Sequence, residues 1–145
     1  MSTDTRQALL VRHAHADWPG FPGTDFDRPL TPRGEADAAI TGYSIRAAGH
    51  APELILVSPA RRTMQTAQII AEHLGLAPTV LCPVDALYNA ESETLAAELR
   101  RAAQQAGLVM VVAHNPGISQ LARELSGDAG SRMFAPADWR LVPLR

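Results

Sequence analysis

Three strand-like runs are the feature of this sequence that most constrains its fold. Residues 8–11, 54–57 and 108–113 are aliphatic runs bounded by polar residues or chain breakers. Continuous apolar runs of this length are typical of parallel strands that are buried on both faces. Since the carboxyl ends of parallel strands meet at one edge of a sheet, the residues that follow the three runs are expected to lie together.

Helix signals fill the intervals between these runs. Each predicted helix opens with a polar cap or a proline, which suits the free N–H groups of a first turn, and closes near a glycine or in a polar turn. The four helices are expected from Thr31-Pro32 to Gly49, from Ser58-Pro59 to about His73, from Ser92 to Gly107, and from Asn115-Pro116 to Gly127. In the first helix, helical spacing predicts a buried face made of Ala36, Ala39, Ile40, Tyr43 and Ala47.

Strands that alternate with helices predict the fold class α/β, a three-layer sandwich with a mostly parallel central sheet flanked by helices. The run 108–113 is the most apolar and is expected at the centre of the sheet. Pro143 suits a closing strand, residues 140–144, at a sheet edge, and residues 79–82 predict one further strand. With 145 residues and 46% hydrophobic content, the chain has the size of a single domain, residues 1–145.

The composition argues against several function classes. The chain has 13 arginines, no lysine and 15 acidic residues, giving a net charge of -2 without charge blocks, so neither a nucleic-acid partner nor a membrane partner is expected. The one cysteine, Cys82, cannot form an internal disulfide or a thiolate metal cluster. The polar start and the absence of an apolar run near the ~20 residues of a membrane span predict a cytoplasmic protein, expected as a monomer.

Cationic residues follow all three strands. Arg12-His13 follows the first run, Arg62 lies shortly after the second, and His114 follows the third. Two of these positions also lie beside helix N-termini, which attract anions. A fixed guanidinium beside His13 disfavours the imidazolium and keeps the ring neutral and nucleophilic. These residues predict a phosphate pocket built around histidine, with catalysis by positioning and charge stabilisation.

Helical spacing distinguishes the two neighbouring arginines of the second motif. Arg61 shares its face with polar residues at 65, 68 and 72, whereas Arg62 shares its face with a less polar stripe at 66, 69 and 73. Arg62 is therefore the expected phosphate ligand. Asn115 after His114 is expected to cap the last helix, so an anion there would also meet free backbone N–H groups, and Asn115 is a further phosphate-binding candidate.

Four motifs span nearly the whole chain. They are Leu10-Val11-Arg12-His13-Ala14, Arg28-Pro29-Leu30-Thr31-Pro32-Arg33-Gly34, Val57-Ser58-Pro59-Ala60-Arg61-Arg62-Thr63-Met64-Gln65-Thr66-Ala67, and Val112-Ala113-His114-Asn115-Pro116. In this order they resemble the histidine phosphatase superfamily, also called the phosphoglycerate-mutase-like group. The resemblance is strongest to its short bacterial phosphohistidine phosphatases of the SixA type.

The resemblance implies a catalytic mechanism and a set of site residues. His13 is the nucleophile that becomes transiently phosphorylated, and Arg12, Arg62 and His114 complete the phosphate pocket. Water then hydrolyses the phosphoenzyme, and neither a metal nor another cofactor is needed. Ala14 stands where a glycine usually follows the nucleophile, an alternative that is common in the short members.

The general acid is the point where this sequence departs from the resemblance. Larger family members carry a glutamate after the third strand, and the matching stretch 85–91 has no clear equivalent. Glu91 and Asp85 are the nearest carboxylates, and Asp25 and Asp27 in the loop before Arg28 are their rivals; of these, Glu91 and Asp25 are the candidate acids. A phosphoramidate leaving group needs less help from an acid. This fits the substrate that the resemblance to the SixA type implies, a phosphorylated protein carrying phosphohistidine, with a small phosphorylated metabolite as the alternative.

Two other functions stay open at this point. The segment His13-Ala14-His15-Ala16-Asp17 has the H-x-H-x-D spacing of binuclear metallohydrolases such as the metallo-β-lactamase-like group, and alternate residues of a strand would share a face toward a metal. Trp18, however, stands where that group has a further histidine. A phosphate pocket with no clear acid is also consistent with a regulatory module that binds phosphorylated partners without turnover.

Overall fold

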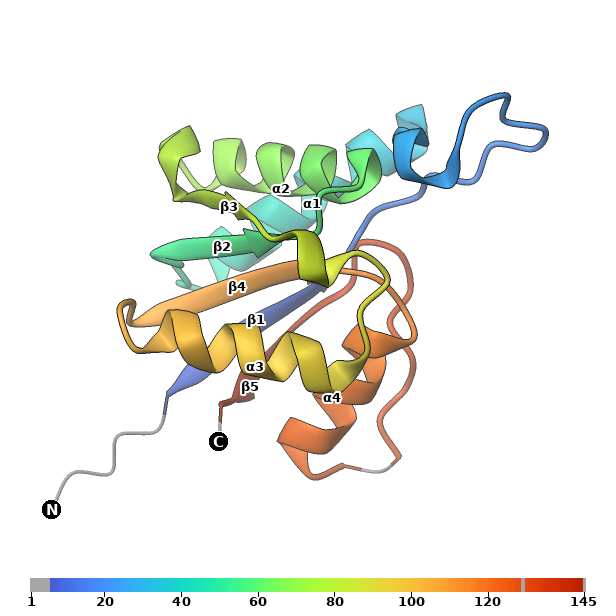
Figure 1. Ribbon diagram of the computed structural model, residues 1–145. Coiled ribbons are helices and arrows are strands. Elements are labelled where there is room, and N and C mark those ends of the chain that lie inside the picture. Colours follow the sequence, from blue (N-terminus) through green and yellow to red (C-terminus); the bar gives the residue numbers. More distant parts are fainter. Residues whose placement is uncertain (1–5, 129, 145) are drawn as a thin grey trace, which may run out of the picture.

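The computed structural model describes residues 6–128 and 130–144 and confirms the α/β sandwich. A five-stranded sheet with the order β3-β2-β4-β1-β5 carries helices on both faces (Figure 1). The strands are β1 (Gln7–Arg12), β2 (Leu54–Val57), β3 (Leu81–Pro83), β4 (Leu108–Ala113) and β5 (Trp139–Pro143). The helices are α1 (Pro32–Ala47), α2 (Arg61–His73), α3 (Ser92–Ala103) and α4 (Gly117–Ser126), with short 3₁₀ turns η1 (Asp25–Asp27), η2 (Pro78–Val80) and η3 (Asp85–Leu87). Within this described part of the chain, no helix is long and apolar enough to cross a membrane.

Parallel pairing brings the carboxyl ends of β1, β2 and β4 to one edge of the sheet. β4 lies between β1 and β2 and is parallel to both, whereas β5 runs antiparallel to β1 at the sheet edge. Arg12 pairs with Ala113 and Val57 with Val112, so the three strands end at nearly the same level. The central place of β4 and the edge place of the strand with Pro143 confirm the sequence-based prediction.

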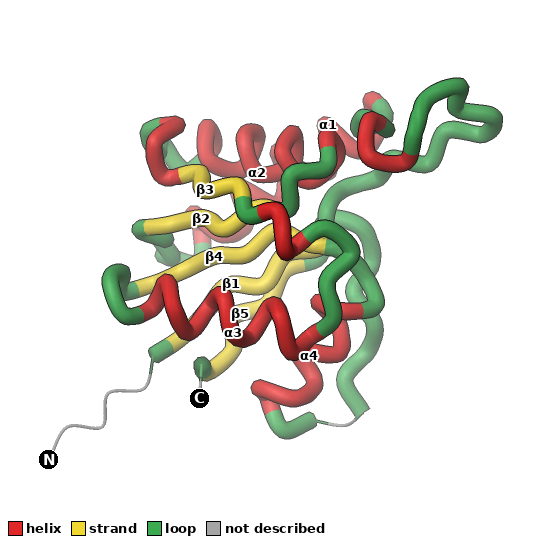
Figure 2. The backbone as a smooth tube through the Cα atoms, viewed as in Figure 1, coloured by secondary structure: helices red, strands yellow, loops and turns green. Residues whose placement is uncertain are grey.

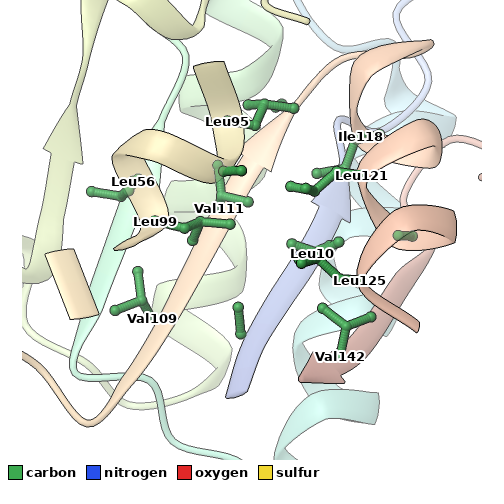
Figure 3. Close-up of a cluster of buried hydrophobic side chains, with 14 of the residues drawn as sticks. Leu10, Leu56, Leu95, Leu99, Val109, Val111, Ile118, Leu121, Leu125 and Val142 are labelled. Carbon is green, nitrogen blue, oxygen red and sulfur yellow. The ribbon is translucent and has the colours of Figure 1, made fainter. Parts of the chain in front are cut away.

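The hydrophobic core has two layers, one on each face of the sheet. α3 and α4 cover one face, and α1 and α2 cover the other (Figure 2). Alternate residues of β1 serve the two layers: Ala8 and Leu10 pack toward α3 and α4, and Leu9 and Val11 toward α1 and α2. Figure 3 shows the first layer, in which Leu10 and Val111 meet the leucines of α3 and α4. Each fully buried aliphatic side chain stabilises the fold by about 1.5–3 kcal/mol, so both layers hold the strands that carry the site.

The first helix buries a different face from the predicted one. Ile40 and Tyr43, which helical spacing assigns to the core, are 66% and 70% exposed. The buried residues of α1 are Gly34, Ala38, Thr41, Gly42 and Ile45. Close packing on α2 explains the difference, because a Cβ added to Gly42 would lie 2.8 Å from the Cβ of His73. Small residues line this contact, Ile45 fills the core beside it, and Ile40 and Tyr43 face outward.

The helix starts agree with the predicted caps only at α1. Thr31 caps α1 as predicted, and its hydroxyl accepts the backbone N–H of Gly34 at 3.0 Å. The other three helices have no side-chain cap. Ser92 is the first residue of α3 instead of its cap, and Ser58 and Asn115 lie before their helices with their side chains bonded elsewhere. The side chains of Ser58 and Asn115 instead form hydrogen bonds at the ends of the strands, with His114 and with the backbone of Phe134.

The strand after α2 is shifted from its predicted position. Residues 78–80 form η2, so β3 starts at Leu81 and continues to Pro83. Pro78 opens the 3₁₀ turn, whose compact backbone cannot pair with β2. Cys82 lies half-buried in β3 as a free thiol.

Candidate active site

His13 follows β1 directly and is held in one tautomer. Its backbone N–H donates to the carbonyl oxygen of Ala113 at 3.0 Å, which fixes it beside the end of β4. Its ring Nδ1 lies 2.7 Å from the carbonyl oxygen of Ala14. Because a carbonyl oxygen can only accept, Nδ1 carries the proton and Nε2 keeps its lone pair. Nε2 is therefore the ring nitrogen available for attack.

The surroundings of His13 favour its neutral form. Burial is the largest cause that lowers the pKa of His13 from 6.5 to about 4, and the charges of Arg62, Arg12 and Arg28 lower the pKa further. The hydrogen bond to the carbonyl oxygen of Ala14 opposes the shift without cancelling it. At neutral pH the ring is therefore uncharged, as a nucleophile must be.

Arg62 is the arginine of α2 that enters the site. It is 3% exposed, whereas Arg61 lies on the exposed side of the helix. Thr66, one turn later, ties α2 to the segment after β1. Its hydroxyl donates to the carbonyl oxygen of Arg62 at 2.7 Å and accepts the backbone N–H of Ala14 at 3.0 Å. The structure thus places Arg62, and not Arg61, beside the histidines.

His114 is buried between Arg62, Ser58 and His13. Nη2 of Arg62 lies 3.3 Å from its Nδ1, and Oγ of Ser58 lies 2.7 Å from its Nε2. A guanidinium can only donate, so Nδ1 accepts, and Nε2 carries the proton and donates it to Ser58. The ring centroid lies 5.5 Å from that of His13. Burial first, and then the charges of Arg62 and His13, lower the pKa of His114 to about 3.

Arg12 and Asn115 meet at one backbone carbonyl. Nη1 of Arg12 and Nδ2 of Asn115 both donate to the carbonyl oxygen of Phe134 at 2.9 Å. Oδ1 of Asn115 accepts the hydroxyl of Ser119 at 2.5 Å, so both ends of its amide have protein partners. In this structure the Asn115 side chain therefore braces the segment after β4 with Oδ1 and with one of the two N–H groups of Nδ2.

Two guanidinium nitrogens of the site have no protein partner. Among the described residues, Nε of Arg12 and Nε of Arg62 are buried without a hydrogen-bond acceptor. Unpaired buried donors are costly, and an anion is the acceptor that would satisfy them. We call Arg12, His13, Arg62 and His114 the histidine–arginine cluster.

Asp25 is the candidate acid that reaches this cluster. Its Oδ2 accepts from Nη2 of Arg62 at 3.1 Å and from the hydroxyl of Tyr88 at 2.6 Å, and its Oδ1 accepts from Nη2 of Arg28 at 2.9 Å. The hydrogen bonds from Tyr88 and Arg28 and the charge of Arg62 hold the pKa of Asp25 well below its usual value. The carboxylate is therefore ionised and carries no proton to donate.

The other candidate acids lie outside this contact network. Glu91 is exposed and precedes the first turn of α3, and Asp85 is exposed in η3. Asp27 accepts the hydroxyl of Thr24 within its own turn. In the part of the chain that the structure describes, Asp25 is the one of the four with a hydrogen bond to the cluster.

The H-x-H-x-D segment does not form a metal-binding group. β1 ends at Arg12, so His13 and His15 do not share a strand face. Nδ1 of His15 lies 2.7 Å from the hydroxyl of Thr31, at the start of α1. Among the described residues, no group of three or more His, Cys, Asp or Glu side chains is placed to hold a metal ion.

Several residues of the site had no role in the sequence analysis. The sequence pattern indicates Ser58 only as a helix cap, and it gives Tyr88 no role beyond its place in the stretch 85–91. The ring of Tyr88 packs edge-on against His114 with centroids 5.7 Å apart. Arg28 and Thr66 lie inside two of the four motifs, which is a signal that they matter. The motifs do not show their partners: Arg28 donates to Asp25 in the preceding turn, and Thr66 accepts from Ala14, which is distant in the chain.

Comparison with known proteins agrees with this geometry. The family model described as "Histidine phosphatase superfamily (branch 1)" matches residues 8–83. An uncharacterized Mycobacterium leprae protein is 33% identical over 120 residues, which cover 81% of this chain and 71% of that protein. A Xenopus laevis protein, the mitochondrial serine/threonine-protein phosphatase PGAM5, is 39% identical over 70 residues, 48% of this chain and 25% of that protein. An uncharacterized chloroplastic protein of Arabidopsis thaliana is 45% identical over 62 residues, and the match spans only 28% of its length.

Solved structures show the same fold over nearly the whole chain. The crystal structure of a proposed phosphohistidine phosphatase SixA from Agrobacterium tumefaciens has a TM-score of 0.81 and 30% identity, covering 94% of this chain and 91% of that chain. A structure of the protein histidine phosphatase SixA in complex with tungstate has a TM-score of 0.82 at 24% identity, covering 93% of this chain and 86% of that chain.

Proposed function

Because this chain belongs to branch 1 of the histidine phosphatase superfamily and is a SixA-like phosphatase, we propose that it moves a phosphoryl group from its substrate to His13 and then to water. The observation that carries this proposal is the state of His13. The ring is neutral, its Nε2 is free, and it lies beside two arginines and 5.5 Å from the ring of His114. Such a cluster supplies a nucleophile together with the positive charge that a transferring phosphoryl group needs.

The reaction has two steps that exchange bonds at phosphorus. In the first, the Nε2 lone pair of His13 forms a P–N bond while the bond from phosphorus to the leaving group breaks, and the leaving group keeps that electron pair and takes up a proton from solvent. In the second, the oxygen of a water molecule forms a P–O bond and gives up a proton to solvent, the P–N bond breaks, its electron pair returns to Nε2, and inorganic phosphate leaves. Splitting one difficult displacement into two easier ones is the general gain of covalent catalysis.

The remaining cluster residues hold the phosphoryl oxygens in this proposal. Arg12 and Arg62 donate to the oxygens, and their unpaired Nε–H groups are suitable donors. Nδ1 of His114 accepts from Nη2 of Arg62 in the structure without ligand, so His114 supports that guanidinium, and it donates to a phosphoryl oxygen only when Nδ1 carries a proton. Asn115, whose amide is already bonded at both ends, keeps the position of His114 and Arg12 through Phe134. No residue role here requires a metal ion.

The state of Asp25 bears on the leaving group. The ionised Asp25 carries no proton to offer beside His13, and Glu91 lies outside the contact network of the cluster. A leaving group that departs readily without a strong acid fits this site best, and the imidazole of a phosphohistidine is a leaving group of that kind. We therefore propose phosphohistidine in a protein as the substrate, in keeping with the proteins named SixA among the structural matches.

A groove beside the site supports a protein-sized substrate. It has a volume of about 750 Å³ and begins at Pro116 and Gly117, directly after the segment that carries His114. Its lining residues lie in the ranges 89–100 and 116–124, along α3 and α4, with Glu91 and Glu124 among them, and the cluster residues lie outside this lining. A polypeptide that carries the phosphoryl group could extend along this groove while its modified side chain reaches His13.

The test is to follow the phosphoryl group on the protein. We expect a ³²P-labelled phosphohistidine protein to give an acid-labile phosphoenzyme and then inorganic phosphate, with a chelator present and without loss of rate. His13→Ala is expected to form no phosphoenzyme. Label on another residue, or full activity in His13→Ala, would contradict the mechanism. Faster turnover of small phosphate esters than of phosphohistidine would favour the metabolite phosphatase, and binding without any phosphate release would favour the regulatory module.

We further propose that the protein acts as a cytoplasmic monomer. The net charge of -2 and the lack of like-charge blocks agree with a freely diffusing enzyme. Sedimentation equilibrium at micromolar concentration tests the oligomeric state, and a dimer mass would contradict this part of the proposal.

A further inference from the structure

The guanidinium of Arg62 is already occupied by an anion of the protein itself. Nη1 of Arg62 donates to the backbone carbonyl oxygen of Asp25 at 2.8 Å, and Nη2 lies 3.1 Å from Oδ2 of the same residue. The side chain of Arg62 is 4% exposed, whereas that of Asp25 is 49% exposed. A buried cation is thus covered by a carboxylate that remains in contact with water.

The carboxylate comes from an exposed loop that two other segments hold in place. The loop of residues 17–28 projects beyond the carboxyl ends of the strands, at the upper right of Figure 1. Tyr88, from the segment after η3, donates to Oδ2 of Asp25 at 2.6 Å, and Arg28 donates to Oδ1 at 2.9 Å. The ring of Phe26 packs edge-on against Tyr88 with centroids 5.3 Å apart. The contact is therefore built by three hydrogen-bond donors and an aromatic pair.

A phosphoryl group and this carboxylate need the same donor. Two anions on one guanidinium face repel each other, and a buried arginine with no anion is unfavourable. In the enzyme without ligand, the carboxylate of Asp25 satisfies Arg62. When a doubly charged phosphoryl group arrives, it can take this donor and also the unpaired Nε–H groups of Arg12 and Arg62, which the carboxylate leaves unused.

We propose that Asp25 is an internal competitor of the phosphoryl group for Arg62, displaced when substrate binds and returning as product phosphate leaves. The inference rests on the proposed function in taking the cluster as a phosphoryl site. It assigns Asp25 a role other than general acid: the carboxylate weakens the apparent affinity of the site for an anion by competing with it. Its carboxylate is half-exposed, so water can replace the donors that it leaves, whereas Arg62 stays fixed in α2.

The test compares the affinity of three variants for inorganic phosphate. Asp25→Asn keeps the shape and removes the charge, so the dissociation constant for phosphate, measured by calorimetry at pH 7 and fixed ionic strength, is expected to fall about three- to tenfold. Tyr88→Phe, which removes one donor that holds the carboxylate, is expected to change the constant in the same direction by a smaller factor. Asp27→Asn is the matched control, because Asp27 lies in the same turn and bonds only Thr24 among the contacts described.

Each other result has a definite meaning. Equal or weaker phosphate binding by folded Asp25→Asn, with wild-type protein still binding phosphate, would overturn the inference and leave the proposed function intact. An equal gain in Asp27→Asn would also overturn it, because the effect would then come from net charge alone. If neither wild type nor Asp25→Asn binds phosphate and neither forms a phosphoenzyme, the proposed function itself fails. Thermal unfolding of each variant confirms that the fold is retained.

Discussion

The hydroxyl oxygen of Ser58 lies 2.7 Å from Nε2 of His114, a ring whose Nδ1 faces the guanidinium of Arg62. The ring is thereby held between a donor on one side and an acceptor on the other, which selects the neutral tautomer with its proton on Nε2. Ser58 is fully buried, so water cannot replace it at this position. The residue that follows β2 thus positions the histidine that follows β4.

Removing the Ser58 hydroxyl is expected to lower activity while the fold is retained. Ser58→Ala leaves the Nε2–H of His114 buried without an acceptor, which costs about 1–3 kcal/mol in stability or is relieved by rotation of the ring. We expect kcat/KM to fall about tenfold or more, measured on a phosphorylated substrate beside urea unfolding. Ser126→Ala, at the exposed end of α4, is the control. Wild-type kcat/KM in Ser58→Ala would show that the hydroxyl does not position His114.

The two neighbouring arginines of α2 are expected to differ sharply in their effect on turnover. Arg62 is buried in the cluster and Arg61 is exposed, although both are arginines in the first helical turn. Loss of a donor to the transferring group typically costs about 10²–10³ in rate, so Arg62→Ala is expected to lose about 100-fold or more in kcat. Arg61→Ala is expected to change kcat less than about twofold. Similar losses in the two variants would contradict the assignment.

The pH dependence of kcat/KM is expected to report the unusual state of His13. Its pKa is lowered to about 4 by burial and by the charges of Arg62, Arg12 and Arg28. As pH falls through this value the ring gains a proton and loses its nucleophilic lone pair, so activity falls at acid pH and is retained through the range where an ordinary histidine titrates. The profile is measured with correction for ionisation of the substrate. An acidic midpoint near about 6.5, the ordinary histidine value, would contradict the prediction.

Packing between α1 and α2 is expected to tolerate change on the outer face but not at the contact. A methyl group added at Gly42 would lie 2.8 Å from the Cβ of His73 and 3.2 Å from the backbone of Ile70. Gly42→Ala is therefore expected to lower the free energy of unfolding by about 1–3 kcal/mol, even though alanine favours a helix. Ile40→Gln, on the exposed face, is expected to change it by less than about 0.5 kcal/mol. Urea unfolding of both variants tests the pair, and a more stable Gly42→Ala would show that the helices separate easily.

The main features of the fold could be predicted because they depend on local pattern. The runs at β1, β2 and β4 are continuous aliphatic segments, and the helices between them are marked by prolines and glycines near their ends, with a side-chain cap at α1. The inward face of α1 could not be predicted in this way. Helical spacing favours large apolar side chains such as Ile40, but the close approach of α2 selects Gly42 and its small neighbours, and that distance is set by the whole sandwich.

By itself, the sequence determined that His13, Arg62 and His114 would meet, because residues that follow parallel strands share one edge of a sheet. It also separated Arg62 from Arg61, since helical periodicity is a property of the local chain. Only the tertiary structure decided the contacts between segments far apart in sequence. Ser58 forms a hydrogen bond with His114 instead of capping α2, and Asp25 accepts from Arg62 as an ionised carboxylate instead of serving as an acid. The reason is that each hydrogen bond forms with the donor or acceptor that the folded chain brings within about 3 Å.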